Sequence, residues 1–116
     1  QCWVSGFSFG ALLCMQLLMR RPEITRFISV SPQPNLYDFN FLAPCPASGM
    51  IIQGKKDELV PIEDTNRLAQ KLQSQKNIVI DYEEISGANH FYDNEMHKLN
   101  KIVSTYIGKE LNSRYR

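Results

Sequence analysis

Hydrophobic positions along the chain alternate between short strand-like runs and longer stretches with helical spacing. The short runs are typical of strands: Met50–Ile52 is continuously apolar, as expected for a strand covered on both faces, whereas positions in Ile78–Ile85 alternate. They predict strands at Cys2–Ser5, Phe27–Ser31, Met50–Gln53 and Ile78–Ile85. The longer stretches predict helices at Phe9–Arg20, from Pro61 to about Gln75, and from Asp93 to about Lys109. Because strands alternate with helices, we expect an α/β fold with a parallel sheet of about four strands and flanking helices.

The first predicted helix is apolar nearly all round, so we expect it to be buried on most of its sides. Pro22 ends it, and Arg20 and Arg21 suit the negative end of its dipole. The connection between residues 32 and 48 is rich in proline and is expected to be irregular. At 116 residues, the chain is expected to form one domain, 1–116.

A Gly-x-Ser-x-Gly sequence, Gly6 to Gly10, lies between the first predicted strand and the first helix. In this setting the pattern predicts a nucleophile elbow, a tight turn that lifts the hydroxyl of Ser8 clear of the backbone. A side chain at either glycine is expected to crowd that turn. The N–H of Phe9, at the start of the helix, would face negative charge that develops beside Ser8.

A serine hydroxyl needs a base to become nucleophilic, and the base needs a group that orients it. His90 follows the fourth predicted strand in a Gly-led loop, and Asp57 follows the third. Parallel strands place their carboxyl ends at one edge of the sheet, so Ser8, Asp57 and His90 should converge there. The competing candidates are the carboxylates Glu58, Glu63 and Asp64 and the second histidine, His97, which belongs to the last predicted helix.

Three segments together resemble the α/β-hydrolase superfamily, most closely its small esterase and dienelactone-hydrolase-like members: Gly6–Gly10, Gly54–Pro61 and Gly87–Phe91. The resemblance runs over essentially the whole chain but covers only the later half of the family's fold. It implies hydrolysis of a carboxylic ester or related acyl bond, with Ser8 as nucleophile, His90 as base and Asp57 as orienting acid. Relatives often have Asp at the position of Asn89, which we expect to be a minor difference.

The resemblance also implies an oxyanion-binding amide from Phe9. Aromatic residues near the site could contact the acyl group, and Phe7, Tyr37 and Phe39 are the candidates. The family's earlier strands and the loop that supplies a second oxyanion amide are absent from this sequence. We therefore interpret the chain as a truncated domain. The alternative to an active esterase is a catalytically impaired, self-associating fragment of one.

Charge, cysteine content and exposed apolar positions bear on partners, cofactors, localisation and oligomeric state. The net charge of +1 does not favour nucleic acid or an anionic membrane as a partner. The cysteines, Cys2, Cys14 and Cys45, lack the spacing of zinc or redox motifs, and neither a metal nor a cofactor is expected. Unpaired cysteines and no recognisable signal peptide favour the cytoplasm. An uncovered first strand and the apolar surface beside it predict a homodimer.

Overall fold

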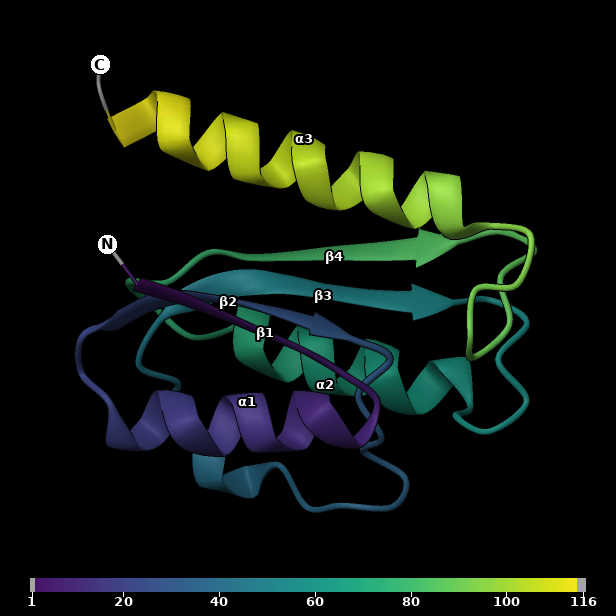
Figure 1. Cartoon of the computed structure of the whole chain (residues 1–116). Helices are drawn as coiled ribbons and strands as arrows, with labels where there is room; N and C mark the ends of the chain where they lie inside the picture. Colours follow the sequence, from purple (N-terminus) through teal and green to yellow (C-terminus); the bar gives the residue numbers. More distant parts are fainter. Residues whose placement is uncertain (1, 115–116) are drawn as a thin grey trace.

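Four parallel strands form a single sheet in the order β1-β2-β3-β4 in the computed structural model, which describes residues 2–114 (Figure 1). The strands are β1 (Cys2–Phe7), β2 (Ile24–Val30), β3 (Ser48–Gly54) and β4 (Ile80–Ile85). The helices are α1 (Phe9–Arg20), α2 (Ile62–Gln73) and α3 (Met96–Arg114), with a short 3₁₀ helix, η1 (Asn40–Leu42). The predicted α/β fold with a parallel sheet is confirmed.

The elements form three layers (Figure 1). Helices α1 and α2, together with η1, cover one face of the sheet, and α3 covers the other. This follows from the strand order: each crossover steps to the next strand in the same direction, so right-handed connections keep to one face. All strands end at the same edge of the sheet, where the loops after β1, β3 and β4 meet.

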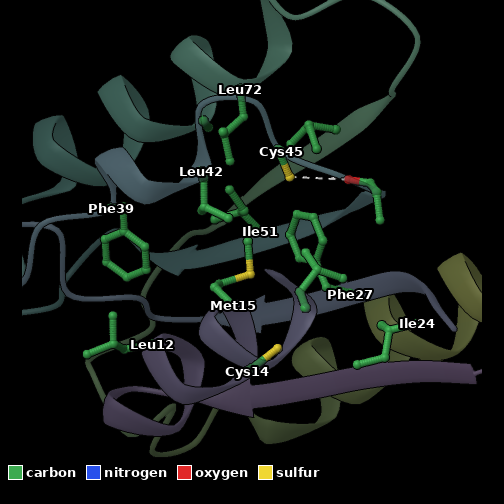
Figure 2. Close-up of a cluster of buried hydrophobic side chains, with 14 residues drawn as sticks. Leu12, Cys14, Met15, Ile24, Phe27, Phe39, Leu42, Cys45, Ile51 and Leu72 are labelled. Atoms are coloured by element: carbon green, nitrogen blue, oxygen red, sulfur yellow. Dashed lines mark hydrogen bonds between the residues drawn. The ribbon is translucent and has the colours of Figure 1, made fainter. Parts of the chain in front are cut away.

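The core between the sheet and helices α1 and α2 is filled by closely packed apolar side chains. Phe27 of β2 and Ile51 of β3 are almost fully buried against Met15 of α1 and Leu72 of α2 (Figure 2). Cys14 and Cys45 lie in the same core, and Cys45 Sγ donates to Ala47 O at 3.4 Å. Cys14, which is 4% exposed, thus packs as a small apolar residue of this core.

The opposite core lies between the sheet and α3. Ile28, Met50 and Ile52 from the sheet pack with Tyr106 of α3, and Trp3 of β1 lies against the Tyr106 ring with centroids 6.0 Å apart. Arg26 of β2 donates to Tyr106 Oη at 3.1 Å and pairs with Glu110 at 3.0 Å. These contacts attach α3 to the middle of the sheet.

Several predicted boundaries were wrong by two residues or more, including the start of β2 at Ile24 rather than Phe27, and left-handed backbone accounts for two of them. The fourth strand starts at Ile80 rather than Ile78, because Asn77 has a positive φ of 73° that breaks the extended conformation. The last helix begins at Met96 rather than Asp93, because Tyr92 and Asn94 have φ values of 59° and 63°. The predicted bounds of the first helix are confirmed, Phe9–Arg20.

The expectation that α1 is buried on most sides was wrong. Ala11, Met15 and Leu18 face the core, but Leu13 and Leu17 are 49% and 42% exposed. An apolar helix sequence shows only that other elements could cover the helix on every side. It does not show whether such elements pack there. The only strand neighbour of β1 within residues 2–114 is β2. Helix α1, like every other helix of residues 2–114, is too short or too polar to cross a membrane.

Candidate active site

Ser8 occupies a strained turn between β1 and α1. Its φ of 58° and ψ of −120° lie outside the regions that side chains usually adopt, and its N–H donates to Val30 O at 2.9 Å. A Cβ placed on Gly6 would lie 2.1 Å from Gly10 O, so the turn requires glycine at residue 6. The same does not hold at Gly10, where an added Cβ would meet nothing within 4 Å, and that part of the expectation was wrong.

The loop after β4 presents His90. Gly87 has a φ of 80°, and the side-chain oxygen of Asn89 accepts from the N–H groups of Phe91 and Asp93 at 3.1 and 3.0 Å. The buried hydroxyl of Tyr92 lies 2.8 Å from Ser31 Oγ, which ties the loop to the end of β2. Burial raises the pKa of Tyr92 to about 12. His90 is thereby fixed, with 1% of its surface exposed.

Asp57 follows β3 in a loop that surrounds its carboxylate with donors. One oxygen, Oδ1, accepts from the N–H groups of Leu59 and Val60 at 2.8 and 2.9 Å. The other, Oδ2, accepts from Gln53 Nε2 at 2.9 Å and lies 2.7 Å from His90 Nδ1. The side chain has no exposed surface. An ionised carboxylate can accept this whole set of hydrogen bonds, which offsets its removal from water.

Ser8, His90 and Asp57 form a continuous chain of hydrogen bonds. Ser8 Oγ lies 2.9 Å from His90 Nε2, and His90 Nδ1 lies 2.7 Å from Asp57 Oδ2. Because a carboxylate can only accept, the proton of a neutral His90 ring belongs on Nδ1. Nε2 is then free to accept the proton of the Ser8 hydroxyl. The geometry fits a serine nucleophile with a general base and an orienting carboxylate.

Solved structures similar to this chain include proteins described as α/β hydrolases or their homologues. ATU1826 of Agrobacterium tumefaciens, a protein of unknown function suggested to be an α/β hydrolase, is 51% identical with a TM-score of 0.96, over 97% of this chain and 52% of that one. An α/β serine hydrolase homologue from Coxiella burnetii is 28% identical with a TM-score of 0.71, over 86% of this chain and 46% of that one. The chain belongs to the α/β-hydrolase superfamily.

Another relative of this chain is the uncharacterized protein RP471 of Rickettsia prowazekii. It is 45% identical over 108 residues, which are 90% of this chain and 45% of that protein. No family model matches the sequence. The chain thus spans about half the length of the relatives that it matches.

The competing carboxylates and the second histidine lie away from the Ser8–His90–Asp57 chain. Asp64 pairs with Arg67 at 3.0 Å on α2, and Glu58, Glu63 and His97 are exposed. Among residues 2–114, no group of three or more His, Cys, Asp or Glu side chains is placed to hold a metal ion.

The aromatic candidates have different surroundings. Phe7 is 41% exposed, and its ring centroid lies 5.3 Å from that of His90. Tyr37 packs on Phe9, next to Ser8 in the chain, with the two ring centroids 5.7 Å apart. Phe39 is only 6% exposed and belongs to the core, where it stacks on Phe41 at 6.0 Å, so it has little surface to offer a substrate.

An apolar cleft of about 370 Å³ adjoins His90 on the α3 side of β1. Phe7, Phe91 and Tyr92 are among its lining residues, together with Ser5 of β1 and Met96 and Leu99 of α3. Sequence reasoning identified Phe7 but not the cleft, because the cleft depends on the position of α3. It also missed Gln53, whose signal was a polar residue at the end of an otherwise apolar strand.

Proposed function

We propose that this chain supplies the nucleophile, base and acid of a serine hydrolase that acts on carboxylic esters or related acyl bonds. The observation that carries the proposal is the pair of contacts from His90, 2.9 Å to Ser8 Oγ and 2.7 Å to Asp57 Oδ2. Buried, neutral imidazole between a hydroxyl and a carboxylate is the arrangement that activates a serine.

In the proposed reaction, Ser8 Oγ attacks the acyl carbon while His90 Nε2 takes the hydroxyl proton. Asp57 stabilises the imidazolium that forms and keeps Nε2 aimed at Ser8. His90 then returns the proton to the departing alcohol, which leaves an acyl group on Ser8. Water, deprotonated by the same ring, attacks this acyl-enzyme, and His90 returns that proton to Ser8 Oγ as the acid leaves.

The N–H of Phe9, in the first turn of α1, is the proposed donor to the oxyanion. An α/β-hydrolase elbow normally works with a second amide from a loop earlier in the fold. Loss of one such donor costs about 10²–10³-fold in rate. We therefore expect residues 1–116, tested by themselves, to react at Ser8 but to turn over slowly.

Phe7, beside His90, and Tyr37, packed on Phe9, are the proposed contacts for the acyl or alcohol part of the substrate. Both offer apolar surface next to Ser8, which favours a small ester over a charged substrate.

The test is hydrolysis of p-nitrophenyl acetate and p-nitrophenyl hexanoate. Ser8→Ala should abolish the reaction above the uncatalysed background. Ser104→Ala, at an exposed serine of α3, is the control and should leave the rate unchanged. Equal rates for wild type and Ser8→Ala would contradict the proposal.

A second candidate is a self-associating protein with little turnover of its own. Two observations favour it: β2 is the only strand neighbour of β1 within residues 2–114, and the α1 residues Leu13 and Leu17 are half-exposed. Surfaces of this kind recruit another chain. Dimerisation without covalent reaction at Ser8 would favour this candidate over the esterase.

A further inference from the structure

We propose that Gln53 is a positioning residue for the Ser8–His90–Asp57 chain and that Thr65 fixes the orientation of its amide. The inference rests on the proposed function, since it concerns how the same site is held. Gln53 is the last residue but one of β3, and both it and Thr65 of α2 have no exposed surface. A buried amide at that depth must form hydrogen bonds, and its partners show what it does.

The amide nitrogen of Gln53 contacts two groups that can only accept. Nε2 donates to Asp57 Oδ2 at 2.9 Å and to Gly54 O at 3.1 Å. The reversed amide would place its oxygen against a carboxylate and a carbonyl, leaving all three oxygens without a proton between them. The two N–H groups of one amide nitrogen match the two acceptors, so this orientation is the only one that satisfies them.

The amide oxygen of Gln53 needs a donor, and Thr65 supplies it. Thr65 Oγ1 donates to Gln53 Oε1 at 2.9 Å. The hydroxyl is anchored to α2, whereas Gln53 belongs to β3 and Asp57 to the loop between them. The hydrogen bond from Thr65 therefore holds the Gln53 amide in one orientation. The packing of α2 against β3 then determines where the N–H groups of that amide point.

Asp57 Oδ2 is the oxygen that also receives the proton of His90 Nδ1. Gln53 consequently acts on the atom that orients the base, while Leu59 and Val60 hold the other carboxylate oxygen. Without the Gln53 donor, the carboxylate could rotate away from His90, and the buried negative charge would lose one of its partners. The ring would then be free to turn its Nε2 away from Ser8.

Three variants test this role. Gln53→Met keeps an unbranched side chain of similar length but removes the donor. Thr65→Val keeps the shape of the side chain and removes only the hydrogen bond from Thr65 Oγ1 to Gln53 Oε1. It therefore tests the same role if Gln53→Met fails to fold. Gln75→Met is the matched control: Gln75 bonds both backbone groups of Cys45, at 2.8 and 2.6 Å, and its amide plays no part in the Ser8 chain.

The first readout is the second-order rate of fluorophosphonate labelling at Ser8. Gln53→Met should slow labelling by about 10- to 100-fold, the range expected when a charged group loses a hydrogen bond. Thr65→Val should slow it by a smaller factor, and Gln75→Met should leave it unchanged. Wild-type labelling rates in both Gln53→Met and Thr65→Val would overturn the proposal.

Gln53→Glu adds a readout that a merely structural role would not move. The introduced carboxyl faces Asp57, and two carboxyls this close share a proton as the pH falls. Once protonated, the introduced carboxyl can donate to Asp57 Oδ2 in place of the amide. The ratio of variant to wild-type labelling rate should therefore rise as the pH is lowered from 8 to 6. A constant or falling ratio would contradict the proposal.

The second readout does not require Ser8 to react, so it separates this inference from the proposed function. The proton between His90 Nδ1 and Asp57 should give a downfield ¹H resonance in the wild type and in Gln75→Met. It should be shifted or lost in Gln53→Met. If the resonance behaves so but Ser8 is never labelled, the esterase proposal fails and the positioning role stands. An unchanged resonance in Gln53→Met would overturn the positioning role.

Discussion

Alanine substitution at the two elbow glycines should have opposite effects. A Cβ at Gly6 would lie 2.1 Å from Gly10 O, 2.5 Å from Gly10 C and 2.8 Å from Ala11 N, all rigid backbone atoms. Ordinary contact begins at 3.4 Å, so the strand and the first turn of α1 would have to separate by about 1 Å. A Cβ at Gly10 meets nothing within 4 Å and lies on a helix.

The expected magnitudes follow from these contacts. Forcing extra volume into a closely packed place costs about 1–3 kcal/mol of unfolding free energy, and we expect Gly6→Ala at the upper end because no side chain can move aside. A displacement of about 1 Å at the reacting atom lowers the rate about 10²-fold. Gly10→Ala should instead raise stability by up to about 1 kcal/mol through helix propensity.

Urea unfolding followed by the fluorescence of Trp3, the one tryptophan of the chain, measures the first effect. Fluorophosphonate labelling of Ser8 measures the second. If Gly6→Ala matched the wild type in both, the elbow would not have the geometry described. If Gly10→Ala were as damaging as Gly6→Ala, the contact argument would fail even though the motif were important.

The sequence predicted those parts of the molecule that depend on local pattern. Helix α1 starts directly after Ser8 and ends just before Pro22, and both limits follow from local signals. The placing of Ser8, Asp57 and His90 at one sheet edge followed from the rule for parallel strands, and the structure brings the three together. Left-handed residues such as Asn77 and Tyr92 have no such signal, and the predicted element ends near them were wrong.

Features that depend on tertiary contacts could not be predicted. The apolar pattern of α1 does not reveal that Leu13 and Leu17 remain exposed, because burial is decided by other elements. Gln53 appeared as the end of a buried strand, and its bonds to Asp57 and Thr65 require the packing of β3 against α2. The motif Gly-x-Ser-x-Gly treats its glycines alike, whereas the structure crowds only Gly6.

Three further outcomes are expected. With Ellman's reagent at pH 8, exposed Cys2 should react at once, whereas Cys14, whose pKa burial raises to about 12, should react only after unfolding; rapid reaction of every thiol would show that the core is open. Burial raises the pKa of Tyr92 from 10.0 to about 12, so the folded state favours the neutral phenol, and the stability this contributes is present below pH 10 and lost as the pH rises through 12. Between pH 9 and pH 12, the free energy of unfolding measured in urea should therefore fall by up to about 3 kcal/mol less in Tyr92→Phe than in the wild type. An identical fall in both proteins would contradict the buried contact. Light scattering at micromolar concentration should give about twice the chain mass of 13.4 kDa, with Leu13→Lys and Leu17→Lys lowering it, and a monomeric wild type would refute the proposed homodimer.

The most direct test of the central claim is to locate the adduct that a fluorophosphonate leaves on the protein. Peptide mapping by mass spectrometry after a short incubation should find one adduct, on Ser8. The same treatment should find none in Ser8→Ala and a strongly slowed reaction in His90→Ala, because the hydroxyl then has no base at 2.9 Å. An adduct on another residue, or equal labelling of wild type and His90→Ala, would contradict the assignment of Ser8 as a nucleophile activated by His90 and Asp57.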